Sequence, residues 1–107
     1  ISQSGVIQDY ITQQTGKFGG QTDADRREVL RWILWDNHKL SSQAGMLRFL
    51  MNFLPQEKRP TMVFPFFESR LKDAYTVLDT HFKHNKWITA DYPTMAGFSC
   101  CGHLYYP

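Results

Sequence analysis

Apolar residues recur along most of the chain at steps of three and four, which is the spacing of one face of an α-helix. The steps are clearest in the third quarter of the chain, at Phe64, Phe67, Leu71, Ala74, Leu78 and Phe82. Pro60 suits the start of this helix, and Pro65 a position in its first turn. The spacing predicts a helix within residues 60–85.

A longer helix is expected before it. The sequence TDAD, residues 22–25, can form a capping box in which Thr22 caps the helix and Asp25 reaches back. The apolar stripe that follows consists of Ile33, Leu40, Ala44, Leu47, Met51 and Leu54. Around RWILW, residues 31–35, the pattern is apolar on every side, which indicates deep burial or contact on a second face. We expect this helix to run to about Phe53, before Pro55.

Two shorter helices are predicted near the ends. In residues 4–15 one face carries Ile7, Tyr10, Ile11 and Gln14. Ser4 is a candidate N-cap and Gly16 a candidate C′ residue. The sequence GKFGGQ, residues 16–21, then reads as a linker.

The last helix should begin after Thr94, its expected N-cap. One face would carry Met95, Phe98, Cys101, and Leu104 or Tyr105, and Pro107 is the stop signal. Since almost no strand pattern is present, the sequence predicts an all-α fold, a helical bundle.

Composition narrows the class of protein. A chain of 107 residues with 42% hydrophobic and 15% aromatic residues is a globular protein of one domain at most. The net charge of +2 comes from basic residues scattered among acidic ones. We therefore expect no nucleic-acid partner, which usually requires a basic stripe. No apolar run approaches the roughly 20 residues of a membrane span, so no membrane partner is expected.

The cysteines and histidines offer little further chemistry. Cys100 and Cys101 are adjacent, so they are poorly placed to bond to each other, and a reduced cytoplasmic protein is expected. His81 and His84 could form one edge of a metal site. Such a site needs more ligands, and Lys83 and Lys86 would repel a cation, so no metal is expected.

Three stretches, in order, carry a resemblance to a known family. QSGVIQDYI, residues 3–11, resembles the Glu/Gln-Ser-x-x-Ile motif of cytosolic glutathione transferases. FGGQTDADRREVLRWILW, residues 18–35, resembles their interdomain linker and the first helix of their helical domain. LDTHFKHNKWITADYPTMAGFS, residues 78–99, resembles the stretch that leads into their N-capping-box helix.

The resemblance implies a domain organisation. Residues 1–18 would be the last helix of a thioredoxin-like domain, and residues 19–107 a truncated helical domain of the glutathione transferase C-terminal type. The chain would then be a fragment of a longer parent that forms a homodimer.

The resemblance also implies a binding site for glutathione as co-substrate. The first turn of a helix has free backbone N–H groups and a partial positive charge, which can hold a carboxylate. The family binds the γ-glutamyl end of glutathione there, and that role falls on Gln3 and Ser4. The alternative is that Ser4 is simply an N-cap.

A pocket for a hydrophobic electrophile would be bordered by Trp35, Asn37, His38 and Tyr105. The alternative places Trp35 in the core and His38 on the surface. Asp36 or Asn37 could also contact glutathione across a dimer. The residue that activates the thiol, and the cis-Pro loop, would lie outside this chain, so no catalytic residue is expected within it.

Two readings of function remain. The parent would attack electrophiles, or reduce disulfides or peroxides, with the glutathione thiolate. Alternatively, it would be a non-catalytic interaction or dimerisation module of the same fold. A helical bundle unrelated to this family, with RWILW as its contact surface, is a third reading that the ordered matches disfavour.

Two positions depart from the family pattern. Gly97 replaces the usual Asp of the capping box, which should weaken the last helix. Ala90 replaces a usual Gly and would be strained if its φ is positive.

Overall fold

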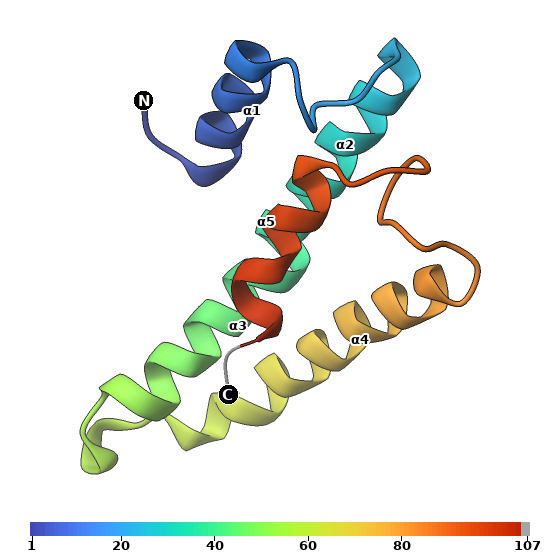
Figure 1. Ribbon diagram of the computed structural model, residues 1–107. Helices are drawn as coiled ribbons and strands as arrows, with labels where there is room; N and C mark the ends of the chain where they lie inside the picture. The colour runs from blue at the N-terminus through green and yellow to red at the C-terminus, as the bar shows by residue number, and fades with distance from the viewer. Residues whose placement is uncertain (106–107) are drawn as a thin grey trace.

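The computed structural model describes residues 1–105, and five α-helices form its framework (Figure 1). They are α1 (Ser4–Thr15), α2 (Asp23–Trp35), α3 (Ser41–Arg48), α4 (Phe64–Phe82) and α5 (Met95–Leu104). Within residues 1–105 there is no strand, so the all-α prediction is confirmed. The expected stop at Pro107 lies outside the described residues.

The long second helix is confirmed as one continuous helical rod over residues 23–53, in which α-helical and π-helical segments alternate. A π-helical segment, Asp36–Leu40, joins α2 to α3, and a second, Phe49–Phe53, extends α3. The rod ends at Leu54, whose backbone is extended before Pro55. Two 3₁₀ turns, Gln56–Lys58 and Thr61–Val63, then lead into α4. In Figure 1 α4 runs back along α3, while α5 crosses the rod.

The core forms where the rod, α4 and α5 meet. The rod contributes Val29, Trp32, Ile33, Leu40 and Leu47, all buried. The predicted α4 stripe is buried at Leu71, Ala74 and Leu78, but Phe82 is 45% exposed. The apolar steps therefore locate the core correctly except at the helix ends.

The predicted buried face of α5 is wrong. Met95 is buried as expected, but Phe98 is 50% exposed and Cys101 is exposed. The buried positions are instead Met95, Ala96, Ser99 and Cys100. Small residues let α5 approach the rod closely, and Ser99 donates a hydrogen bond to the buried Asp36 there.

Some of the predicted helix caps are observed and others are not. Gly16 is left-handed at φ 69°, and its N–H donates to the Thr12 carbonyl as a C-cap should. Thr22 Oγ1 accepts from the Asp25 N–H at 3.1 Å. Ser4 is not the N-cap, since it is the first helical residue and Gln3 precedes it at the cap. Thr94 holds the cap position of α5, but its buried hydroxyl makes no hydrogen bond.

Ala90 has φ 58°, so the condition under which strain was expected at this position is met. This conformation brings Cβ close to the following carbonyl in any residue other than glycine. The loop before α5 therefore carries local strain.

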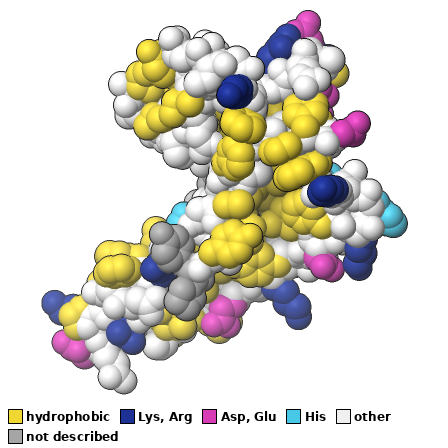
Figure 2. All heavy atoms as spheres, in the orientation of Figure 1, with side chains coloured by type: hydrophobic (Ala, Val, Ile, Leu, Met, Phe, Trp, Pro, Cys, Tyr) yellow, Lys and Arg dark blue, Asp and Glu magenta, His cyan; other side chains and the backbone are white. Residues whose placement is uncertain are grey.

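The shape is extended for a chain of this size. The Cα radius of gyration is 15.6 Å, against about 13 Å for a compact domain of this length. The accessible surface is 7530 Å², against about 6200 Å² for a monomer of this mass. Part of the excess is apolar, since Ile7, Tyr10 and Ile11 on α1 are 41–52% exposed. Figure 2 shows hydrophobic side chains on the surface both in the region of α1 and in the region of α3.

Among residues 1–105, no helix is both long enough and apolar enough to cross a membrane.

Candidate functional site

The N-terminus of α1 has an unusual backbone. Gln3, the residue at the cap, has φ 70° and ψ 122°. Residues with side chains rarely adopt a positive φ, and such a conformation costs about 1–3 kcal/mol. The Gln3 carbonyl accepts the Ile7 N–H at 3.0 Å, so the helix closes directly on this residue. Outliers of this kind cluster at binding sites.

Ser4 follows at the first position of α1, and its side chain is exposed. The first turn of a helix has N–H groups without an intrahelical acceptor and a partial positive charge. No side chain caps these groups, and the first turn contains no acidic residue. The hydroxyl of Ser4 and the free N–H groups can therefore receive a carboxylate.

Gly5 lets this turn lie close to α2. A Cβ at position 5 would stand 2.9 Å from Cγ2 of Ile33 and 3.6 Å from Nδ2 of Asn37. The first distance is shorter than any ordinary carbon contact, so only glycine fits. Sequence reasoning missed Gly5, although a glycine inside a helix often indicates a close approach.

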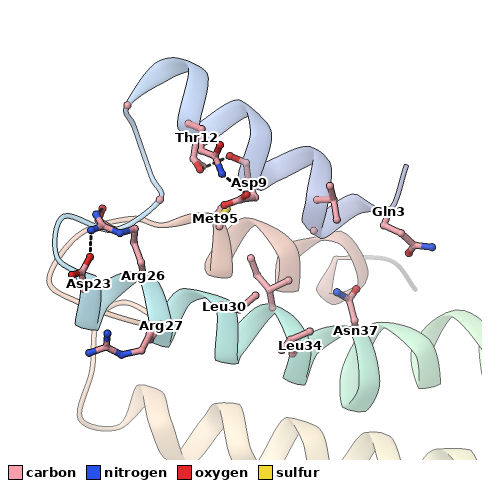
Figure 3. Close-up of a pocket in the computed structure, with 17 residues that line it drawn as sticks. Gln3, Asp9, Thr12, Asp23, Arg26, Arg27, Leu30, Leu34, Asn37 and Met95 are labelled. Atoms are coloured by element: carbon pink, nitrogen blue, oxygen red, sulfur yellow. Dashed lines mark hydrogen bonds and ion pairs between the residues drawn. The ribbon is translucent and has the colours of Figure 1, made fainter. Parts of the chain in front are cut away.

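A groove of about 960 Å³ runs between α1 and α2 (Figure 3). Gln3 lies at one end of it, and Asn37 points toward α1 near that end. The apolar lining consists of Val6, Leu30, Ile33, Leu34 and Met95. Leu30 and Leu34 are 55% and 61% exposed, although both are large aliphatic residues. The α2 side of the groove is thus largely apolar, whereas its α1 side also carries the polar residues Asp9, Thr12 and Gln13.

A second pocket, of about 230 Å³, lies between the end of α4 and α5. It is lined mainly by Phe82, Trp87, Phe98, Leu104 and Tyr105. Cys100 and Cys101 also border it. Burial, and then the negative charge of Asp36, raise the pKa of the Cys100 thiol to about 12, so this thiol is protonated and unreactive near neutral pH.

The four residues predicted to border an electrophile pocket are not brought together. Trp35 packs edge-on against Trp32, with ring centroids 5.2 Å apart, and belongs to the margin of the core. Asn37 lines the groove, His38 is exposed, and Tyr105 lines the second pocket with 83% of its surface exposed. Gln3 and Asn37 are the pair of predicted residues that share one cavity.

The hypothesis that Asp36 contacts glutathione across a dimer is wrong. Asp36 is 1% exposed, and its carboxylate accepts hydrogen bonds from Ser41 and Ser99. Both carboxylate oxygens are thus used inside the core.

His81 of the HFKH stretch makes structural contacts, whereas His84 is exposed. The His81 ring packs edge-on against Trp32, and its Nε2 lies 3.2 Å from the Trp87 carbonyl oxygen. Among residues 1–105, no three His, Cys, Asp or Glu side chains are grouped to hold a metal ion.

Comparison with known proteins identifies the fold. The sequence matches no protein-family model and no curated protein at a significant level. Solved structures do match. They include a possible glutathione S-transferase from Rhodopseudomonas palustris (TM-score 0.87, 24% identity) and the glutathione transferase Ure2p5 from Phanerochaete chrysosporium (TM-score 0.86, 20% identity). The matches cover 96% and 94% of this chain, but 46% and 45% of those chains.

Two matching structures contain ligands. A glutathione transferase from Burkholderia graminis has two glutathione molecules bound per subunit. It matches with a TM-score of 0.85 and 23% identity, over 92% of this chain and 41% of its own. Ure2p5 has also been cocrystallised with 1-(S-glutathionyl)-2,4-dinitrobenzene. This chain therefore has the fold of part of a glutathione transferase, and it spans less than half the length of the structures it matches.

Proposed function

We propose that this chain supplies part of a glutathione site, in which Ser4 and Gln3 bind the γ-glutamyl end of the tripeptide. The observation that carries the proposal is the positive φ of Gln3, which lies directly before an exposed serine and an uncapped helix N-terminus. A carboxylate would gain hydrogen bonds from the free N–H groups and from the Ser4 hydroxyl. The glutathione found in a protein of the same fold supports this ligand.

The reaction we propose for the whole protein uses the glutathione thiolate as a nucleophile. It would attack an electrophilic carbon, or reduce a disulfide or peroxide. Ure2p5, which has the same fold, was cocrystallised with a conjugate of glutathione and dinitrobenzene. This ligand supports the first of the two reactions for the present protein. The residue that activates the thiol would come from outside this chain. The contribution of residues 1–105 would be to orient glutathione, which lowers the entropic cost of the reaction.

We also propose the domain division at residues 1–18 and 19–107, because the glycine-rich linker separates α1 from the rod. The free thiols Cys100 and Cys101 support a reducing, cytoplasmic setting.

A second copy of the protein is the partner proposed for the groove between α1 and α2. Leu30 and Leu34 expose an apolar stripe there. Leu34→Glu should shift sedimentation toward the monomer, whereas Val77→Glu, a matched change at an exposed position of α4, should not. Equal sedimentation of the Leu34 variant and the unaltered chain would exclude this surface.

The glutathione site is tested by calorimetric titration of the chain with glutathione. Ser4→Ala should weaken binding about tenfold, because it removes a hydrogen bond to a charged group. Ser69→Ala, at an exposed position of α4, is the matched control and should bind as the unaltered chain does. Unchanged affinity in the Ser4 variant would refute the role assigned to this residue.

A further inference from the structure

The helix that carries Gln3 and Ser4 is held only lightly by its own side chains. Within α1, Thr12 is the buried residue, while Ile7, Tyr10 and Ile11 face outward. α1 also contacts α5, and its first turn lies close to Ile33 of α2 at Gly5. The chain continues from α1 through the linker of residues 16–21, so the position of α1 depends in part on what holds this linker.

The linker is fixed to α5 through Phe18. The Phe18 carbonyl accepts the N–H of Met95, the first residue of α5, at 2.8 Å. This contact satisfies one of the free N–H groups at the start of α5, where the Thr94 hydroxyl makes no cap hydrogen bond. The Phe18 ring also packs edge-on against Phe98, with centroids 5.2 Å apart. These contacts hold Phe18 at φ 67°, a strained value for a residue with a side chain.

Tyr92 makes a second attachment, from the loop before α5. Its hydroxyl accepts the Gln21 N–H at 2.8 Å and donates to Asp25 Oδ2 at 2.6 Å. One side chain thus joins the linker, the first turn of α2 and the loop before α5. These partners lie 67 and 71 residues apart in sequence.

The linker also touches α1 itself. A Cβ at Gly19 would stand 2.9 Å from Thr12 Oγ1, so the linker folds back tightly against the buried side of α1. Movement of the linker is therefore transmitted to the helix. Since a helix of 12 residues is about 18 Å long, a tilt of about 5° at its C-terminal end would move its N-terminus by roughly 1.5 Å. Displacements of this size strongly affect binding geometry.

We propose that Phe18 and Tyr92 are positioning residues, which clasp the linker to α5 and so determine how well the start of α1 binds glutathione. This inference rests on the proposed function for the identity of the ligand. The contacts by which Phe18 and Tyr92 hold the linker do not depend on it. Neither residue lines the groove. Their effect would reach the site through the linker and the rigid helix.

The test compares Tyr92→Phe and Phe18→Ala with the unaltered chain, with Tyr75→Phe on α4 as the matched loss of a hydroxyl. Two quantities are measured: glutathione affinity by calorimetry and amide hydrogen exchange by NMR. We expect both clasp variants to bind glutathione about threefold to tenfold more weakly, because Tyr92→Phe removes two hydrogen bonds and Phe18→Ala removes the ring contact with Phe98. Exchange should accelerate in α1 and the linker but not in α4.

The outcomes separate the inference from the proposed function. Unchanged affinity and unchanged α1 exchange in both variants would overturn the clasp, as would faster exchange spread evenly over α1 and α4, which indicates a general loss of stability. If Ser4→Ala has no effect on affinity, or the unaltered chain binds no glutathione, the proposed function fails together with the affinity half of this inference. The exchange comparison then decides alone whether the clasp holds α1.

Discussion

Ser99 Oγ on α5 donates a hydrogen bond of 2.5 Å to Oδ2 of Asp36, the residue at the junction of α2 and α3. Ser41 Oγ donates to the other carboxylate oxygen at 2.6 Å. Asp36 is 1% exposed, so these hydroxyls replace the water that a carboxylate would otherwise bind. The contact joins positions 63 residues apart and sets the face that α5 presents to the rod.

Ser99→Ala should therefore destabilise the chain by about 1–3 kcal/mol, because it leaves a buried carboxylate oxygen without its donor. The measurement is urea unfolding followed by circular dichroism. Ser69→Ala on α4, whose side chain is exposed, is the control and should change stability little. Equal midpoints for the two variants would show that the buried contact contributes nothing.

The two cysteines should differ in reactivity by orders of magnitude. Cys101 is exposed, whereas Cys100 is 2% exposed and its thiol pKa is raised to about 12 by burial and by Asp36. Since the thiolate is the reactive form, a disulfide reagent at pH 8 should titrate one thiol rapidly and the second only on unfolding. Mass analysis of the labelled peptide identifies the residue. Fast labelling of both thiols in the folded chain would contradict the burial of Cys100.

Gly97→Asp should stabilise α5. An aspartate there would sit in the first turn, opposite the unpartnered Thr94 hydroxyl and near the positive end of the helix. The site has room, since a Cβ at position 97 would lie 3.9 Å from Ile88 Cγ2. Removing a helical glycine and completing the cap should each contribute about 1 kcal/mol.

Gly97→Ala serves as the control, because it supplies the helix propensity without the carboxylate. The melting temperature should rise in the order Gly97, Ala, Asp. If aspartate gives no more than alanine, the capping explanation is wrong.

Acid should loosen the clasp through Asp25. The Tyr92 hydroxyl, and less strongly Thr22 and the Gln21 backbone, lower the pKa of Asp25 below its ordinary value of 3.8. A carboxyl whose pKa is lower in the folded state adds stability above its unfolded pKa and loses it as the pH falls. Asp25→Asn should therefore flatten the acid limb of the stability curve below about pH 4. Asp73→Asn, a change at an exposed position of α4, is the control, and its stability should fall more steeply with acid than that of Asp25→Asn. If the two variants give the same stability curve, Asp25 does not contribute to the acid sensitivity.

The helix positions could be predicted because their signals are local. The spacing of Leu71, Ala74 and Leu78, the glycine at 16 and the threonine at 22 each act within one or two turns. The buried face of α5 could not be predicted in this way. Large residues such as Phe98 suggested burial, but the face that packs carries Ala96 and Ser99. The reason is that Ser99 bonds the carboxylate of Asp36, which lies 63 residues away in sequence.

The candidate site was predictable only in part. Gln3 and Ser4 were expected at a ligand, and the sequence gives no indication that Gln3 would adopt a positive φ. Tyr92 was missed entirely, since its partners Gln21 and Asp25 lie at the other end of the chain. Trp35 was assigned to a pocket by resemblance. Its contact with Trp32 depends on how the helix is wound next to the π-helical segment Asp36–Leu40.

The most direct test of the central claim is a titration of the chain followed through the NMR amide signals of Ser4 and Gly5. Glutathione and γ-glutamylcysteine should shift these signals and saturate them, because both ligands carry the γ-glutamyl group. Cysteinylglycine, which lacks it, should leave them in place. Equal shifts with all three ligands, or shifts confined to the pocket around Phe98 and Tyr105, would contradict a γ-glutamyl site at the start of α1.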